Sequence, residues 1–204
     1  MILTQIRARF AGVVILALGA LGAAPAAFAQ DQTETSQVAV GRPDAPVTVT
    51  EYFSFNCPLC AQFHMETMPQ IFSQYIETGK VRFVFRDFPQ DTLALSAAMI
   101  LRCVSEPLYF GFVQMLYKQQ SNWSSAADPV AAVGKLGRIA GLSENRVAAC
   151  LSDREVGDAI VAEQNRASRE LQISVPPTFD IGGELIAGVL SFSEFEEIVE
   201  RLLN

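Results

Sequence analysis

The chain has 204 residues, a formal net charge of −7 and a hydrophobic fraction of 50%. This length fits one globular core or one domain with a sizeable insertion. An acidic composition with a single histidine argues against nucleic acid and anionic lipid as partners, so we expect no nucleic-acid partner.

The first 29 residues predict a cleaved secretory signal peptide. Arg7 and Arg9 supply a basic start, an apolar run covers 11–24, and Ala27-Phe28-Ala29 is a small-residue cleavage signal. A retained membrane anchor is the alternative, but the run is rich in Ala and Gly and is broken by Pro25, whereas a spanning helix needs about 20 strongly apolar residues. We therefore expect export to the periplasm, where disulfides persist.

The next segment predicts the start of an α/β domain. A polar lead-in belongs to an N-terminal extension over 30–44, and alternating β-branched and aromatic residues predict a strand over 46–53. Apolar residues at helical spacing follow, with Pro69 as a kink or helix junction and Gly79 as a stop. The stretch KVRFVFRDF predicts a second strand, and together these elements form a β-α-β unit with parallel strands and a right-handed crossover.

Helical patterns then replace strand patterns over residues 91–171. One of these helices has Asp128 as its N-cap and Pro129 at its first position. Strand signal returns around a two-residue turn at Gly182-Gly183, and a final amphipathic helix is capped by Ser191 or Ser193. We therefore expect an α/β domain over 45–90 and 172–204, interrupted by an all-helical insertion domain over 91–171.

Two cysteines, Cys57 and Cys60, stand in the stretch SFNCPLCAQFH, between the first strand and the following helix. Unpaired backbone N–H groups and the helix dipole stabilise an anion at a helix start, which favours a thiolate at Cys57. Pro58 fits the first helical position because it has no N–H to leave unpaired. Since the thiolate is the reactive species in disulfide exchange, this pattern favours a redox-active pair.

Other uses of the cysteines are weaker. A structural zinc site usually needs four ligands, but the chain has one histidine, and Cys103 and Cys150 are isolated in sequence, so we expect no metal. A purely structural Cys57–Cys60 bridge would close too short a loop to stabilise the fold much. In an oxidising compartment we expect Cys103 and Cys150 to form a second, structural disulfide rather than remain buried free thiols.

The motifs in this order resemble the DsbA family of thiol:disulfide oxidoreductases over residues 40–204. The resemblance rests on VTVTEYFSFNCPLC, GKVRFVFRDFP, the helical insertion and PPTFDIGG. It implies a thioredoxin-like α/β fold, with a central mixed sheet flanked by helices and an inserted all-helical domain. It also implies an oxidase that donates the Cys57–Cys60 disulfide to reduced or unfolded exported proteins, uses no other cofactor, and is reoxidised by a DsbB-type membrane partner.

The resemblance assigns roles to particular residues. Cys57 becomes the exposed nucleophile and Cys60 the buried resolving thiol. Pro177 becomes the cis-proline that faces the disulfide, although the register leaves Pro176 as an alternative, and residues 176–178 become the substrate-binding loop. Glu51 matches an acidic residue beneath the family's active site, unless it is a surface residue at a strand edge.

The sequence departs from the family pattern at two positions. Many members have His where this chain has Leu59, and Leu cannot donate a hydrogen bond to the thiolate, so we expect a higher Cys57 pKa and a less oxidising pair than in those members. Pro176 stands where Thr or Val is usual, and it offers substrate no backbone N–H. His64 lies on the same helix face as Cys60, where it either tunes Cys60 or only packs and hydrogen-bonds locally.

Two other functions remain open at this point. The first is a disulfide isomerase or reductase of the same fold, but isomerases of this type usually add a dimerisation region, and none is seen here, so we expect a monomer. The second is a non-catalytic secreted binding protein that uses the helical insertion and keeps Cys57–Cys60 as a structural bridge.

Overall fold

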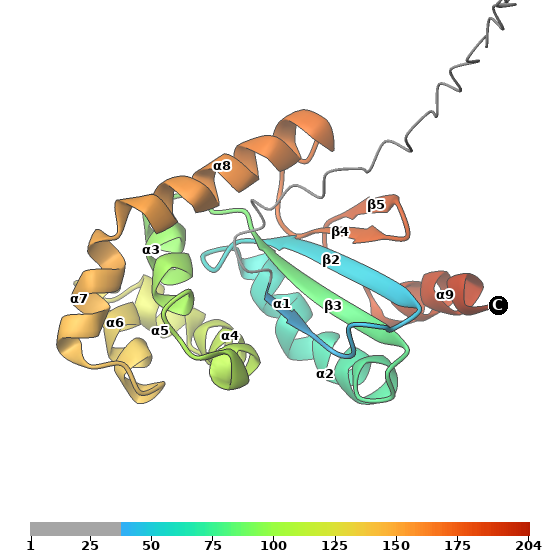
Figure 1. Ribbon diagram of the computed structural model, residues 1–204, viewed down its shortest axis with the longest axis horizontal. Coiled ribbons are helices and arrows are strands. Elements are labelled where there is room, and N and C mark those ends of the chain that lie inside the picture. The colour runs from blue at the N-terminus through green and yellow to red at the C-terminus, as the bar shows by residue number, and fades with distance from the viewer. Residues whose placement is uncertain (1–37) are drawn as a thin grey trace, which may run out of the picture. The chain divides into compact units, whose positions relative to one another are not determined.

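A five-stranded mixed sheet organises the fold (Figure 1). The computed structural model describes residues 38–204, so the predicted signal peptide and most of the polar lead-in lie outside the described residues. The strands are β1 (Val38–Val40), β2 (Val47–Phe53), β3 (Val81–Asp87), β4 (Thr178–Ile181) and β5 (Glu184–Ala187), in the order β1-β3-β2-β4-β5. The pair β2–β3 is parallel and the other pairs are antiparallel. The predicted mixed sheet is confirmed, and β2 occupies its centre.

The predicted β-α-β unit is present, but its helical part is divided. It consists of α1 (Pro58–Glu66), α2 (Met68–Ile71) and a π-helical turn, η1 (Phe72–Ile76). The junction between α1 and α2 falls at Thr67, and Pro69 lies in the first turn of α2, where its missing N–H has no intrahelical partner to lose. Gly79 follows with a φ of +77°, a conformation that suits glycine.

Every element described between β3 and β4 is a helix, as the sequence predicts. These are α3 (Thr92–Leu101), η2 (Glu106–Leu108, a 3₁₀ turn), α4 (Tyr109–Lys118), α5 (Gln120–Ser124), α6 (Pro129–Ile139), α7 (Glu144–Ser152) and α8 (Arg154–Glu170). Figure 1 shows α3 to α7 grouped toward one end of the sheet and α9 (Phe192–Leu203) toward the other end. The division into two domains stays a prediction of the sequence.

Side-chain caps fix where several helices begin. Asp128 accepts a hydrogen bond from the Ala131 N–H and starts α6, as expected from its sequence position. Ser191 and Glu194 form a capping box at the start of α9, which decides between the two serines considered there. The turn at Gly182-Gly183 has φ values of +62° and +89°, and it joins β4 to β5 as predicted.

One strand was not predicted from the sequence. Val38–Val40 falls inside the segment assigned to the N-terminal extension, yet it pairs antiparallel with β3 as β1. Three residues are too few for a recognisable alternation, and the pairing comes from the neighbouring strand. The first strand of the sheet therefore lies inside 30–44, so it was wrong to place this whole segment outside the sheet.

The core contains contacting phenylalanine side chains that fix α1 on the sheet. The Phe63 ring of α1 lies 4.5 Å from that of Phe179 on β4 and 6.3 Å from that of Phe83 on β3, measured between centroids. All three side chains are fully buried. This packing holds the start of α1, and with it the cysteine pair, at the end of the central strand. Within residues 38–204, no helix combines the length and apolar character that crossing a membrane requires.

The candidate redox site

Cys57 is the N-cap of α1, and its sulfur serves the capping role. Its backbone is extended (φ −88°, ψ 118°), Pro58 takes the first helical position, and the Cys60 backbone N–H donates to the Cys57 Sγ over 3.4 Å. The Cys57 sulfur therefore occupies the place that an Asp or Ser oxygen takes in most helices. A negative charge on that sulfur is stabilised by this N–H, which has no partner within the helix, and by the positive end of the helix dipole.

The two thiols differ strongly in acidity. Hydrogen bonding from the Cys60 thiol, followed by the backbone N–H groups of Cys60 and Leu59, lowers the pKa of Cys57 to about 6, although burial and the Glu51 charge act in the opposite direction. Burial, followed by the hydrogen bond to Cys57 and the charge of Glu51, raises the pKa of Cys60 far above the range of ordinary thiols. At pH 7 one sulfur is a thiolate and the other keeps its proton.

The prediction that Cys57 is exposed is wrong, whereas its role as the nucleophile stays a prediction. Only 6% of Cys57 is exposed, and Cys60 is fully buried. Both are free cysteines, and the Cys57 Sγ lies 3.5 Å from the Pro176 carbonyl oxygen, to which it donates when it is protonated. The loop before β4 covers the sulfur because β4 pairs with β2, the strand that leads into α1.

The peptide bond between Pro176 and Pro177 is cis, which is the register that the Pro-Thr-Phe motif favours. Thr178 is buried, and its hydroxyl donates to the Val175 carbonyl oxygen over 2.6 Å. The Gly188 N–H donates to the Pro177 carbonyl oxygen over 2.8 Å. These bonds hold the loop against Cys57, and they leave the Pro176 carbonyl pointing at the sulfur.

Glu51 and His64 form a buried pair on the central strand and α1. The His64 Nε2 and Glu51 Oε2 atoms are 2.9 Å apart, and both side chains are 0% exposed. The surface alternative for Glu51 is therefore excluded, because β2 lies between β3 and β4. Of the two alternatives for His64, tuning of Cys60 or a local hydrogen bond, the structure shows the hydrogen bond. Its partner is Glu51, whose charge raises the pKa values of both cysteines.

Two glutamines that the sequence does not single out reach the site from the helical insertion. The Gln114 Nε2 of α4 lies 3.0 Å from the His64 Nδ1. The Gln120 Nε2 of α5 donates to the carbonyl oxygens of Phe55 and Cys57, over 2.7 Å and 2.9 Å. Glutamine is common on helices and these contacts span 50 to 65 residues, so no local pattern could have identified them.

Pro58 and Leu59 lie on the outer side of the Cys-X-X-Cys turn. Both are exposed, Leu59 to 48%. A side chain at position 59 therefore meets solvent, and its effect on the thiolate is screened. Leu59 itself offers no hydrogen-bond donor to Cys57.

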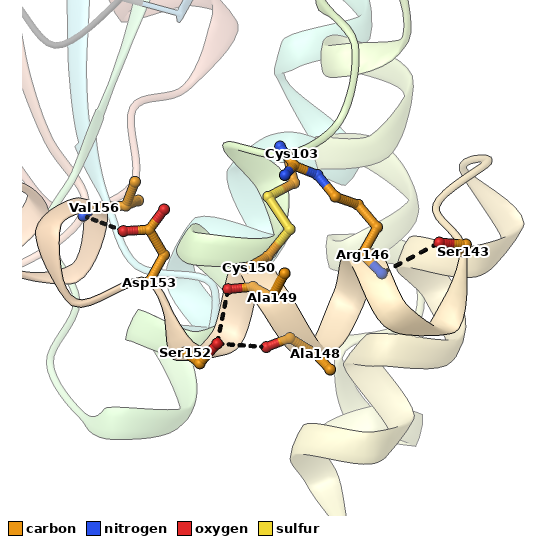
Figure 2. Close-up of a disulfide and its surroundings, with 9 residues drawn as sticks. All are labelled: Cys103, Ser143, Arg146, Ala148, Ala149, Cys150, Ser152, Asp153 and Val156. Carbon is orange, nitrogen blue, oxygen red and sulfur yellow. Dashed lines mark hydrogen bonds between the residues drawn. A yellow bond between two sulfur atoms is a disulfide. The ribbon is translucent and has the colours of Figure 1, made fainter.

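Cys103 and Cys150 are joined by a disulfide, with a Cα–Cα distance of 6.3 Å (Figure 2). The bridge ties the turn after α3 to the last part of α7. The next residue after α7, Asp153, accepts a hydrogen bond from the Val156 N–H and starts α8. It lies within the helical segment and apart from the Cys57–Cys60 pair in sequence. Among residues 38–204 no cluster of three or more His, Cys, Asp or Glu side chains could hold a metal ion.

Fold and site together define a protein of the thioredoxin fold, with a Cys-X-X-Cys pair at a helix start and a cis-proline loop against it. The chain matches the Thioredoxin family model over residues 33–201. It resembles the crystal structure of alpha-DsbA1 from Wolbachia pipientis, with 26% identity and a TM-score of 0.78, over 82% of this chain and 91% of that one. BdbD from Bacillus subtilis shares the fold, with 23% identity and a TM-score of 0.73, over 82% and 92% of the two chains.

A curated relative is the "Putative protein-disulfide oxidoreductase" of Rickettsia bellii. It is 28% identical over 151 residues, which are 74% of this chain and 58% of the relative. The chain spans 56% to 62% of the length of the Rickettsia relatives that it matches. The chain belongs to the DsbA family.

Proposed function

We propose that the chain is an exported thiol:disulfide oxidoreductase that oxidises the dithiols of newly secreted proteins. The observation that carries this proposal is the geometry of the pair: the Cys57 Sγ caps α1 and accepts the Cys60 N–H, while Cys60 is fully buried, so the pKa of Cys57 is lowered and that of Cys60 is raised. A stable Cys57 thiolate favours the dithiol form of the protein, and this makes the disulfide form an oxidant. The Rickettsia relatives are named putative protein-disulfide oxidoreductases, which supports thiol–disulfide exchange.

The proposed reaction has two exchange steps. A substrate thiolate attacks the Cys57 Sγ, a mixed disulfide forms, and Cys60 leaves as a thiolate that takes up a proton. The second substrate thiolate then attacks the substrate sulfur of the mixed disulfide, and Cys57 leaves as a stable thiolate. The substrate dithiol loses two electrons and becomes a disulfide, while the Cys57–Cys60 bond gains them.

The surrounding residues take supporting roles in this proposal. The Pro176–Thr178 loop binds an extended substrate peptide beside Cys57, with the Pro176 carbonyl as an acceptor and no N–H to give. Glu51 lies beneath the pair and exchanges a proton with Cys60. Pro58 starts the helix and Leu59 adds its backbone N–H to the groups that lower the Cys57 pKa, and the Cys103–Cys150 bridge is structural.

The family resemblance and the predicted leader support a proposal for the location and the partners. We propose that the signal peptide over 1–29 directs the chain to the periplasm, where it acts as a monomer on reduced or unfolded exported proteins. A DsbB-type membrane protein would then restore the Cys57–Cys60 disulfide.

The test is a stoichiometric oxidation. The purified protein, with the Cys57–Cys60 bridge formed, is mixed with a peptide containing two cysteines, and the peptide disulfide is quantified by mass spectrometry. We expect one peptide disulfide per protein molecule, and none from the Cys57→Ser variant. If the protein does not oxidise the peptide but speeds the reduction of insulin above the uncatalysed rate, it is a reductase. If it instead rescues a scrambled protein, it is an isomerase. A bridge inert in all three assays would indicate a structural staple in a binding protein.

A further inference from the structure

The turn that leads from β2 into α1 has to hold Cys57 in one particular backbone conformation. Cys57 caps α1 with an extended backbone (φ −88°, ψ 118°), in which the Cys60 N–H reaches the Cys57 Sγ. The turn covers residues 54–57 and is closed by the Cys57 N–H, which donates to the Ser54 carbonyl oxygen over 3.0 Å. In the disulfide form the covalent bond to Cys60 also holds Cys57, whereas in the dithiol form, which the structure shows, non-covalent contacts have to do so. The contacts of this turn therefore matter more to the dithiol form than to the disulfide form.

One buried side chain of the helical insertion bonds the turn at two points. The Gln120 Nε2 of α5 donates to the Phe55 carbonyl oxygen over 2.7 Å and to the Cys57 carbonyl oxygen over 2.9 Å. A side-chain amide has two N–H groups, so both are used, one on each carbonyl. The Cys57 carbonyl also accepts the Ala61 N–H over 3.2 Å, the bond that starts α1. Gln120 is only 9% exposed, so water cannot readily take its place if the side chain is removed.

The other two residues of the turn are also bonded to the insertion. The Tyr117 hydroxyl of α4 donates to the Ser54 carbonyl oxygen over 3.4 Å. The Asn56 Nδ2 donates to the Asp91 Oδ2 over 2.7 Å, while the Asp91 Oδ1 accepts the Ala94 N–H and caps α3. The insertion therefore holds all four residues of the turn, and its bond to the cysteine itself comes from the glutamine of α5.

We propose that Gln120 is the positioning residue through which the helical insertion keeps Cys57 in its capping geometry in the dithiol form. The inference deepens the proposed function, on which it rests, because it names a residue that sets how strongly the Cys57–Cys60 disulfide oxidises. Without the two bonds from Gln120, the turn adopts other conformations and the Cys57 Sγ moves away from the Cys60 N–H. The dithiol form is then destabilised, while the disulfide form keeps its covalent bond. The disulfide becomes a weaker oxidant, because its strength depends on a stable dithiol form.

The groups that act directly on the charge of Cys57 are left unchanged when Gln120 is replaced. Hydrogen bonding from the Cys60 thiol and from the backbone N–H groups of Cys60 and Leu59 lowers the Cys57 pKa, and burial and the charge of Glu51 raise it. The Tyr117 hydroxyl also interacts electrostatically with Cys57, and burial raises its own pKa well above the ordinary value. A change in Cys57 acidity in a Gln120 variant therefore reports on the position of the cysteine among these groups.

The alternative is a purely structural role, in which Gln120 only satisfies carbonyl groups in the core. Gln120→Met separates the two roles, because methionine has nearly the same length and no donor. Gln119→Met is the matched control, since Gln119 is the preceding residue, is partly exposed and lines an open groove at the surface. Trp123→Phe is a control for stability, because Trp123 is buried and its Nε1–H donates to the Leu116 carbonyl oxygen inside the insertion over 2.8 Å.

The experiment measures the redox equilibrium, the Cys57 pKa and the stability of both redox forms. Each variant is equilibrated with glutathione buffers, Cys57 is alkylated, and the alkylated fraction is quantified by mass spectrometry. We expect Gln120→Met to lower the equilibrium constant for reduction of the Cys57–Cys60 disulfide about tenfold, near the upper end of what one net hydrogen bond contributes. The ultraviolet thiolate absorbance should show the pKa of Cys57 rising from about 6 to about 7.

Urea unfolding of the two redox forms gives an independent readout of the same effect. By the thermodynamic cycle, the unfolding constant of the dithiol form should rise about tenfold more than that of the disulfide form in Gln120→Met. Gln119→Met should leave every quantity unchanged, and Trp123→Phe should destabilise both forms equally without changing the glutathione equilibrium. Equal destabilisation of both forms by Gln120→Met, with the wild-type glutathione equilibrium, would overturn the positioning role.

A second variant covers the case in which Gln120→Met does not fold. Gln120→Asn keeps an amide but is shorter by one methylene, so it cannot reach both carbonyls, and it should shift the same readouts in the same direction by less. An unchanged glutathione equilibrium and Cys57 pKa in this variant would then overturn the inference.

The outcomes also separate this inference from the proposed function. If the wild-type protein fails to oxidise the dithiol peptide, the oxidase function is wrong, but the glutathione and pKa readouts still decide the role of Gln120. If the wild type oxidises the peptide and Gln120→Met keeps the wild-type glutathione equilibrium and Cys57 pKa, the positioning role is wrong and the function stands.

Discussion

The lowered pKa of Cys57 should make the stability of the dithiol form depend on pH. Cys57 is an acid whose pKa falls from 9.0 to about 6 on folding. Its contribution is therefore complete above about pH 9 and is lost as the pH falls through about 6. Because a tenfold change in acidity is worth about 1.36 kcal/mol, we expect about 1.4 kcal/mol at pH 7 and about 4 kcal/mol above pH 9. Cys60 adds nothing below about pH 9, where it is protonated in both the folded and the unfolded chain, and its raised pKa opposes folding above that pH.

Urea unfolding of the reduced protein and of its reduced Cys57→Ser variant measures this contribution. The difference between their free energies of unfolding should be nearly constant below pH 6 and should grow as the pH rises to 9, because the other titrating groups cancel between the two proteins. The disulfide form, which has no thiolate, should not show the trend. A difference that stays flat from pH 5 to 9 would refute the assignment of the lowered pKa to Cys57.

Three other substitutions test neighbouring parts of the account. Leu59→His should lower the Cys57 pKa and make the pair more oxidising, by at most about 1 kcal/mol or fivefold in the glutathione equilibrium constant because position 59 is half exposed; an unchanged or more reducing potential would refute this. Pro176→Val restores a backbone N–H and should tighten peptide binding several-fold, by about 0.5 to 1.5 kcal/mol in titration calorimetry, and no gain would count against the loop as a peptide-binding strand. Replacing both Cys103 and Cys150 with Ala opens a loop of 47 residues and should lower the free energy of unfolding by about 4 kcal/mol, whereas a loss under about 1 kcal/mol would show that the bridge does not stabilise the fold.

Local sequence patterns predicted most of the elements that position the site. The strand before the cysteines, the helix after them and the hairpin at Gly182-Gly183 each carry their own signal, in residue alternation, in Pro58 at the helix start, or in glycines at positive φ. The place of Cys57 at a helix N-cap followed from the same signals. These features are short-range, so a single sequence contains enough information to locate them.

What the sequence could not give is the part of the site made by long-range packing. The prediction that Cys57 is exposed was wrong because its sulfur is in contact with Pro176, which lies 119 residues away in the sequence. The explanation of the lowered Cys57 pKa was incomplete for a related reason. The sequence pointed to the backbone N–H groups at the helix start, but hydrogen bonding from the Cys60 thiol contributes more. Both effects depend on distances that only the folded chain sets.

The buried network around Glu51 shows the same division. Glu51 was identified through the family, and His64 through its helical spacing from Cys60, but neither pattern predicts that the two side chains meet. Gln114 and Gln120 join them from helices of the insertion. The insertion therefore supplies polar contacts to the redox site as well as packing, and this conclusion required the structure.

The central claim is that Cys57 is a stable thiolate at neutral pH while Cys60 is not. The direct measurement is the ultraviolet thiolate absorbance of the reduced protein as a function of pH, with the reduced Cys57→Ser variant subtracted. We predict a single ionisation with a midpoint near pH 6 that the variant lacks. A midpoint near 8.5 to 9, as for an unperturbed thiol, would contradict the account and the oxidase function built on it.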